Sequence, residues 1–178
     1  GKGVLVSVID SGIDYMHPDF QNEDGSTRIL ALWDQTIAPD PSKNFLPPHG
    51  YALGTLFTQE QINAAIDAPT LQERTSLCPS FDTSGHGTHV TGIAAGNGRV
   101  QIANRGVAYE ASLLVIKLGA PGPMGFPSTT QLMQAVDFSV RFATEHHLPL
   151  SINLSFGNTY GSHSGTSLLE TYLNSGSD

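Results

Sequence analysis

Two side chains of this sequence could work together in acid–base chemistry, although they lie far apart along the chain. Asp10 directly follows a short apolar run, and His86 lies between two glycines that permit close backbone approach and an exposed imidazole. A buried carboxylate can hold an imidazole in one tautomer and stabilise its protonated form. The two residues could thus supply a general base and the acid that orients it. An ordinary turn after a strand would equally account for Asp10 and the Ser-Gly that follows it.

The histidines His86 and His89 open a second interpretation, in which both ligate a metal together with Asp10. Zinc hydrolases carry two histidines four residues apart on a helix, with a glutamate beside the first. Here the second histidine follows after three residues, and no acidic residue lies between the two. The spacing therefore disfavours a metal hydrolase, and we assign no metal ligands and no cofactor.

The hydrophobic pattern predicts how the chain positions these side chains. Three short apolar runs are typical of buried strands, and four segments with helical spacing or capping signals are typical of helices. Because the two kinds of segment alternate, we predict an α/β fold with a parallel sheet, whose active site would lie at the carboxyl ends of the strands. Asp10 occupies such an end. The predicted strands are residues 4–9, 112–118 and 150–154, and the predicted helices are residues 58–66, 89–95, 128–147 and 167–173.

One long stretch interrupts this pattern. It lacks sustained periodicity and is rich in proline and glycine, which are typical of turns. Within it, Thr58 and Gln61 have the spacing of a capping box. We therefore predict that residues 33 to about 80 form a surface insertion in one domain that spans residues 1–178.

Composition and charge exclude several classes of function. Hydrophobic residues make up 39% of the chain and charged residues only 13%, which is typical of a folded protein rather than a disordered one. The net charge of −8 argues against binding to nucleic acid or to anionic membranes, since their phosphates would be repelled. No apolar run approaches the roughly 20 residues that a membrane-spanning helix needs. Cys78 is the only cysteine, so no internal disulfide can form, and we expect an inert thiol in a loop.

Two long motifs resemble those of the subtilisin-like serine proteases, peptidase family S8. Residues 8–14 (VIDSGID), followed by residues 17–20 (HPDF), resemble the aspartate motif, and residues 85–95 (GHGTHVTGIAA) resemble the histidine motif. The resemblance implies a three-layer subtilisin-like fold with a parallel sheet. The chain would be the N-terminal part of the catalytic domain, truncated before the C-terminal part. Shorter landmarks follow in the family's order at residues 106–108, 117–119 and 152–157.

The predicted insertion narrows this resemblance. Its start at Trp33-Asp34 and its helix at residues 58–66 resemble the clostridial germination proteases, the Csp-like branch of the family. The narrower resemblance implies a secreted or spore-associated protein, while the sequence itself assigns no compartment.

The family resemblance implies a role for each matching residue. Asp10 would orient the imidazole, and His86 would act first as general base and then as general acid. A polypeptide substrate would add to the protein as an extended strand, and its side chain before the scissile bond would enter a pocket. The backbone of Leu118, Gly119 and Ala120 would pair with the substrate, and Ser155, Phe156 and Gly157 would line the pocket.

Asp19 matches a position that ligates calcium in some members of the family. The rest of that ligand loop would lie near residues 97–104, where the sequence does not match the family's pattern. A structural calcium ion is compatible with the resemblance, but we assign none.

A catalytic triad also needs a nucleophile, and Ser167 imitates one at the end of a Gly-Thr-Ser sequence. The family's serine is followed by a small residue and then by proline, whereas Leu168-Leu169-Glu170 follows here. Ser167 and Glu170 have the spacing of a capping box, which predicts the start of a helix. We expect the nucleophilic serine to lie beyond Asp178, so that the isolated chain is an inactive fragment of an endopeptidase.

Two other classes of function remain open. A pseudoprotease or peptide-binding module could hold a partner along its substrate strand without catalysis, and a metal-dependent hydrolase could use His86, His89 and Asp10. The truncated sheet would also leave an unpaired edge strand and apolar surface. We therefore expect a polypeptide substrate and self-association through that edge, and neither nucleic acid nor a membrane as partner.

Overall fold

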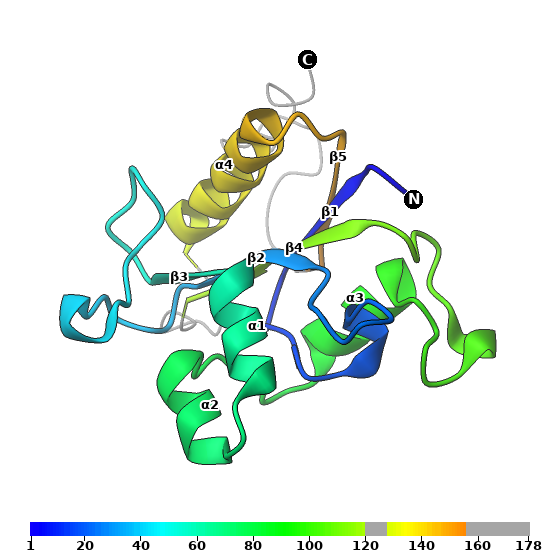
Figure 1. Cartoon of the computed structure of the whole chain (residues 1–178). Coiled ribbons are helices and arrows are strands. Elements are labelled where there is room, and N and C mark those ends of the chain that lie inside the picture. Colours follow the sequence, from blue (N-terminus) through cyan, green and yellow to red (C-terminus); the bar gives the residue numbers. More distant parts are fainter. Residues whose placement is uncertain (120–127, 156–178) are drawn as a thin grey trace, which may run out of the picture.

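The computed structural model of the chain describes residues 1–119 and 128–155, and a five-stranded sheet forms its centre (Figure 1). The strand order is β3-β2-β4-β1-β5. β1 pairs in parallel with β4 on one side and with β5 on the other, and β2 pairs in parallel with β4. β3 is antiparallel to β2. The strands are β1 (Leu5–Asp10), β2 (Ile29–Asp34), β3 (Thr55–Thr58), β4 (Ser112–Lys117) and β5 (Leu150–Leu154).

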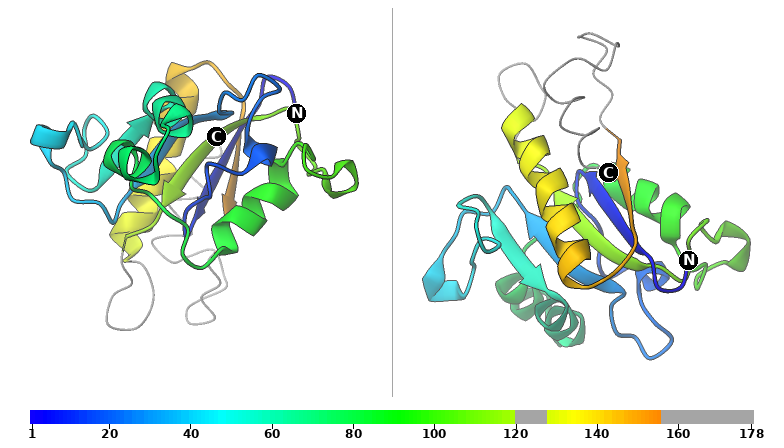
Figure 2. Two further views of the ribbon diagram at one scale, coloured as in Figure 1. Left: turned by 60° about the horizontal axis from the view of Figure 1, so that its bottom comes forward. Right: turned by 90° about the horizontal axis from the view of Figure 1, so that it is seen from above.

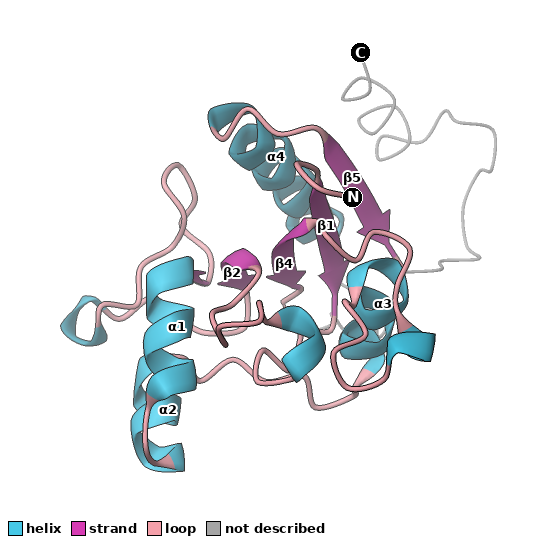
Figure 3. Ribbon diagram, turned by 45° about the vertical axis from the view of Figure 1, so that its right-hand side comes forward, coloured by secondary structure: helices cyan, strands magenta, loops and turns pink. Residues whose placement is uncertain are grey.

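Helices cover both faces of this sheet. Figure 2 shows α4 along one face, and α1, α2 and α3 lie on the other, as Figure 3 also shows. This arrangement of helices on both sides of a mostly parallel sheet confirms the predicted three-layer α/β fold. None of the described helices combines the length and the hydrophobicity that crossing a membrane requires. The helices are α1 (Gln59–Asp67), α2 (Leu71–Leu77), α3 (His86–Ala95) and α4 (Thr129–Glu145), with short 3-10 helices at Pro18–Phe20, Pro41–Lys43 and Ile102–Asn104.

The central strand β1 contributes to the hydrophobic core on both faces of the sheet. All six of its residues are buried. Because successive side chains of a strand point to opposite faces, Val6 and Val8 pack in the core beneath α1 and α3, while Leu5 and Ile9 pack in the core beneath α4. A strand that is buried on both faces reads as a continuous apolar run, which is why the sequence predicts it directly.

Five elements agree with the predicted boundaries to within two residues, namely β1, β4, β5, α1 and α4. Ser128 and Gln131 form a capping box at the start of α4, and Thr58 and Gln61 form the predicted capping box at the start of α1. α3 begins at His86, three residues before the predicted start at His89. The helix predicted at residues 167–173 lies outside the described residues.

Residues 33–80 differ from the prediction in where they lie. Trp33 and Asp34 end β2, which lies inside the sheet between β3 and β4, and both residues are buried. Phe57 in β3 and Ile62 in α1 are fully buried in the core beneath α1 and α3. This part of the chain therefore extends the sheet through β3 and contributes side chains from β3 and α1 to the core.

Cys78 directly follows α2. It lies in a loop position, as predicted, and is fully buried in the core. Loss of contact with water raises the pKa of its thiol to about 12. Since the thiolate is the reactive form, the expectation of an inert thiol agrees with this environment.

The edge strand β5 pairs with β1 on one side, and no strand of the described part of the chain lies on its other side. A groove of about 980 Å³ runs beside it, between β5 and α4. The predicted self-association would use this edge and this groove. The groove is lined largely by aliphatic side chains, among them Val136, Val140, Leu148, Ile152 and Leu154.

The burial of Phe57 predicts a large loss of stability when its ring is removed. Phe57→Ala should lower the free energy of unfolding by about 3–5 kcal/mol, because a cavity opens in the core. Leu71→Ala is the matched control within the same segment, since Leu71 is 66% exposed and should change stability by less than about 0.5 kcal/mol. Urea unfolding measures both values. Equal effects of the two substitutions would contradict the placement of β3 in the core.

Candidate active site

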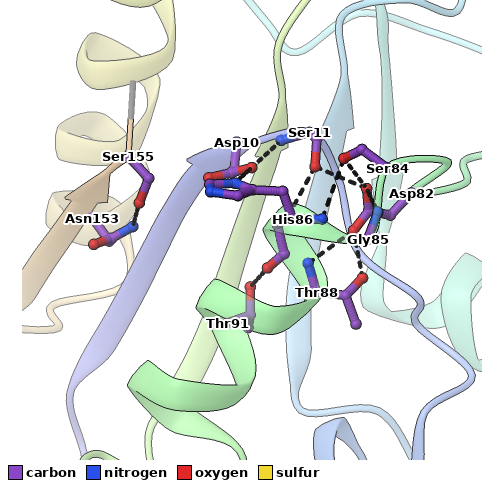
Figure 4. A network of polar contacts seen from close by, with 11 residues as sticks. Asp10, Ser11, Asp82, Ser84, Gly85, His86, Thr88, Thr91, Asn153 and Ser155 are labelled. Atoms are coloured by element: carbon purple, nitrogen blue, oxygen red, sulfur yellow. Dashed lines mark hydrogen bonds and ion pairs between the residues drawn. The ribbon is translucent and has the colours of Figure 1, made fainter. Parts of the chain in front are cut away.

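Asp10 and His86 meet at the carboxyl end of β1 (Figure 4). His86 Nδ1 lies 2.8 Å from Asp10 Oδ1, and because a carboxylate can only accept, the ring donates the hydrogen bond. Asp10 is 1% exposed, whereas the side chain of His86 is 59% exposed. The fold therefore buries the carboxylate and leaves the opposite edge of the imidazole open to solvent or to a substrate.

The carboxylate of Asp10 is held on one side by the backbone. Its Oδ1 also accepts a 2.6 Å hydrogen bond from the N–H of Ser11. Its Oδ2 is buried and has no hydrogen-bond partner among the described residues. A buried carboxylate oxygen of this kind favours a positive charge nearby, and the protonated ring of His86 is the group in contact with the same carboxylate.

This contact changes the acidity of His86. The hydrogen bond to Asp10, and then the negative charge of Asp10, raise the pKa of the imidazole above its ordinary value. The raised pKa means that the folded protein binds a proton at His86 more tightly than the unfolded chain does. The stabilisation from the ion pair is therefore fully present below pH of about 6.5, and it is lost as pH rises through the folded pKa.

A glycine at position 87 lets the helix that carries His86 approach the loop after β1. A Cβ atom built on Gly87 would lie 2.2 Å from the carbonyl oxygen of Gly12 and 3.2 Å from Cβ of Asp10. Real Cβ atoms do not come so close to backbone atoms. The sequence predicts that the glycines around His86 permit close backbone approach. The contact between Gly87 and the carbonyl of Gly12 is such an approach.

Side chains from three places satisfy the first N–H groups of α3. The N-cap residue is Gly85, which has no side chain to cap the helix. Instead, the N–H of His86 donates to Ser84 Oγ, the N–H of Gly87 donates to Ser11 Oγ, and the N–H of Thr88 donates to Asp82 Oδ2. The N–H groups at a helix start have no partner within the helix, and here their hydrogen bonds include one that ties α3 to the loop after Asp10.

Asp82 is the residue of this network that sequence reasoning missed. Partial burial acts to raise the pKa of its carboxyl, but hydrogen bonds from Thr88, Ser11 and Gly85 outweigh this and hold the pKa below its ordinary value. Asp82 is therefore charged at neutral pH. The sequence does contain an indication of this role. Asp82 lies shortly before a helix start whose N-cap is a glycine without a capping side chain, and the helix dipole favours negative charge there.

The residues predicted to bind substrate lie partly outside the described residues, since Ala120, Phe156 and Gly157 are not described. The N–H of Leu118 donates to the carbonyl of Asp10, and the N–H of Gly119 donates to Oε1 of Gln35. Both N–H groups are thus engaged within the chain.

Ser155, the described residue of the predicted pocket, directly follows β5. Its Oγ accepts a 2.6 Å hydrogen bond from the side-chain amide of Asn153. Ile9 of β1 pairs with Leu154 of β5, so Ser155 directly follows the last residue pair of the two strands. Ser155 therefore lies beside the end of β1, as Figure 4 shows.

Other candidate ligands and donors lie in different surroundings. In the described part of the chain, no three His, Cys, Asp or Glu side chains are grouped so that they could hold a metal ion, which leaves the metal-hydrolase interpretation without a ligand set.

Asp19 Oδ1 accepts a hydrogen bond from the N–H of Val100, so this carboxylate holds the loop that follows α3.

Comparison with known proteins finds relatives among proteases. The sequence profile of the subtilase family, Peptidase_S8, matches residues 1–175. The minor extracellular protease Vpr of Bacillus subtilis strain 168 is 29% identical over 159 residues, which cover 89% of this chain and 14% of Vpr. The solved structure of the Clostridium perfringens CspB protease is similar with a TM-score of 0.81 and 34% identity, and the match covers 98% of this chain and 33% of that chain. The chain thus spans about a third or less of the length of these relatives.

The hydrogen bond between Asp10 and His86 predicts the titration of the imidazole. In an NMR titration, His86 should have a pKa above 6.5, and Asp10→Asn should lower that pKa because the negative charge is removed. Asp40→Asn is the matched control, since Asp40 is an aspartate that hydrogen-bonds only within its own turn. A His86 pKa that is the same in the protein and in Asp10→Asn would contradict the contact.

The close approach of Gly87 to Gly12 predicts opposite effects for two glycines of one helix. Gly87→Ala should lower the free energy of unfolding by about 1–3 kcal/mol, because the new methyl group overlaps a backbone carbonyl. Gly92→Ala should raise it by up to about 1 kcal/mol, because Gly92 has open space at its Cβ position and alanine favours helix. Urea unfolding distinguishes the two, and equal shifts would overturn the interpretation of the contact.

Proposed function

The chain belongs to the subtilase family, and on that premise we propose that it forms part of the catalytic domain of a serine-type endopeptidase. The observation that carries the proposal is the 2.8 Å hydrogen bond between His86 Nδ1 and Asp10 Oδ1. A buried carboxylate that orients an exposed imidazole is the arrangement by which a hydroxyl nucleophile is activated. The structural likeness to the CspB protease confirms the predicted resemblance to the Csp-like branch.

In this proposal His86 moves protons through Nε2, the ring nitrogen that does not contact Asp10. Nε2 accepts the hydroxyl proton of a serine as the serine oxygen attacks the carbonyl carbon of the scissile bond. The imidazolium then gives this proton to the leaving amine as the C–N bond breaks and an acyl-enzyme forms. His86 then deprotonates a water that attacks the acyl carbon, and the imidazolium returns the proton to the serine oxygen as the acid product leaves. Asp10 keeps its negative charge throughout and stabilises the imidazolium.

We place the nucleophilic serine in a part of the protein outside residues 1–178. The chain spans only 33% of the CspB chain, so that relative has much sequence that this chain does not match. Ser167 lies outside the described residues, and Leu168 and Glu170 after it depart from the family's pattern. On this account the isolated chain is a fragment without activity of its own.

The substrate would be a polypeptide, bound in extended form past the ends of β4 and β5. The backbone of Leu118, Gly119 and Ala120 remains the proposed edge for this strand, and their carbonyl groups would accept its hydrogen bonds, since the N–H groups of the first two are engaged. Ser155, Phe156 and Gly157 remain the proposed lining of the pocket. In the isolated 178-residue chain, a second copy would pair with the edge of β5 that no strand of the described residues occupies.

The proposal predicts how full-length protein responds to substitutions at the pair. His86→Ala and Asp10→Asn should each lower kcat for a peptide substrate by about 10³- to 10⁴-fold, because the serine loses its base or the base loses its orientation. Hydrolysis of a fluorogenic peptide measures this. His49→Ala, which changes an exposed histidine in a loop, is the control and should keep full activity.

The isolated 178-residue chain provides the complementary test. It should not hydrolyse the same peptide, because it lacks the proposed nucleophile. Hydrolysis by this chain that Ser167→Ala abolishes would place the nucleophile within it and refute this part of the proposal. Full-length protein that binds the peptide but never cleaves it would instead identify a pseudoprotease.

A further inference from the structure

We infer that Asp82 is a positioning residue for the Asp10–His86 pair, and this inference rests on the proposed function. Its carboxylate accepts hydrogen bonds from two segments that must be held together, the loop after β1 and the first turn of α3. We call this set of contacts the Asp82 network, and Figure 4 shows most of it. The network consists of Asp82, Ser84, Gly85, Gly87 and Thr88 with Ser11 and Asp14 from the loop after β1.

Two hydroxyl groups carry the connection between the segments. Ser11 Oγ donates to Asp82 Oδ1 over 2.8 Å and accepts from the N–H of Gly87 over 2.9 Å. Thr88 Oγ1 donates to Asp82 Oδ2 over 2.6 Å and accepts from the N–H of Asp14 over 2.9 Å. Each hydroxyl thus donates its only proton to Asp82. Its lone pairs can then accept from a backbone N–H of the other segment.

Ser11 connects this network directly to the catalytic carboxylate. Its N–H donates to Asp10 Oδ1, the same oxygen that accepts from His86 Nδ1. Its hydroxyl meanwhile accepts from Gly87, the residue next to His86. A shift of Ser11 would therefore move the carboxylate and the imidazole relative to each other, and Asp82 holds Ser11 in place.

The chemistry of the contacts requires a carboxylate at position 82. Every group that contacts the two oxygens is a donor: the hydroxyls of Ser11, Ser84 and Thr88, and the N–H groups of Gly85 and Thr88. An amide has one oxygen and one NH₂ group. In asparagine, the NH₂ group would therefore face the donors that one oxygen of Asp82 now accepts from. Asp82→Asn keeps the size of the side chain but cannot keep the network.

The N-cap residue of α3 has no side chain with which to satisfy the first N–H groups of the helix. Gly85 occupies the N-cap with a positive φ of 76° and makes no side-chain hydrogen bond to the helix. The cap is supplied instead by Ser84 and Asp82, and by Ser11 in the loop after β1. An ordinary N-cap would stabilise α3 without fixing its distance from Asp10, whereas this cap does both.

The test compares variants of full-length protein by steady-state kinetics across pH. Asp82→Asn should lower kcat by about tenfold to a hundredfold with little change in KM, because the pair loses its alignment while substrate contacts remain. The acidic limb of the kcat profile should also move to lower pH, since the imidazolium loses its alignment with Asp10 and the nearby negative charge of Asp82. Ser11→Ala should act in the same direction, and Ser11→Thr, which keeps the hydroxyl, should retain most of the activity.

Two controls separate positioning from general stability. Asp40→Asn removes a carboxylate that likewise accepts from the backbone N–H and the hydroxyl of a serine two residues on, but far from the pair, and should leave kcat and the acidic limb unchanged. The double variant Ser11→Ala with Asp82→Asn should have a kcat within about twofold of that of Asp82→Asn alone. The two substitutions break the same chain of contacts, so their effects should not add. If Asp82→Asn does not fold, the comparison of Ser11→Ala with Ser11→Thr decides.

The outcomes distinguish this inference from the proposed function. The inference would be overturned by a folded Asp82→Asn protein whose kcat is within about twofold of that of the unaltered protein and whose acidic limb lies at the same pH. This holds even if the melting temperature of the variant falls. If the unaltered full-length protein has no activity, the proposed function fails, and NMR of the His86 Nδ1 proton then tests the network alone. A proton signal and imidazole pKa that are unchanged in Asp82→Asn would overturn it.

Discussion

The hydrogen bond from His86 Nδ1 to Asp10 Oδ1 constrains the whole structure, because it requires two backbone segments to touch without intervening side chains. Asp10 ends a strand, His86 begins a helix, and the bond between them is 2.8 Å long. Only glycine at position 87 gives the helix enough room beside the carbonyl of Gly12. The sheet, the helix start and the loop between them are all arranged around this one contact.

The parallel sheet supplies the rigidity that the contact needs. β1 lies between β4 and β5 and is buried on both faces, so its carboxyl end is fixed by packing as well as by hydrogen bonds. The helix start is not fixed by the sheet in this way. It is fixed by hydroxyl and carboxylate groups, since Ser84, Ser11 and Asp82 take the place of an ordinary cap. A hydrophobic layer thus places the aspartate, and a polar network places the histidine.

The sequence was sufficient for the parts of the fold that bury continuous apolar runs. β1, β4 and β5 could be predicted because each is a short apolar run, and α4 because its apolar residues recur at helical spacing, and Asp10 and His86 followed from recognisable motifs. β2 and β3 were not predicted. β3 has only four residues and lies within the turn-rich stretch, and β2, although as long as β1, runs into that stretch at Trp33. Their burial depends on pairing with each other and with β4, which a local pattern does not show. Asp82 was missed for a related reason, since its partners Ser11 and Thr88 are brought to it by the fold.

In the proposed function, Asp10 and His86 activate a serine that lies elsewhere in the protein. This can be measured by reacting full-length protein with a fluorophosphonate, which labels activated serines, and by locating the labelled residue by mass spectrometry of its peptides. We expect one labelled serine outside residues 1–178 and no label in a protein that carries His86→Ala. A label on Ser167, or a label that persists in His86→Ala, would refute the proposed function.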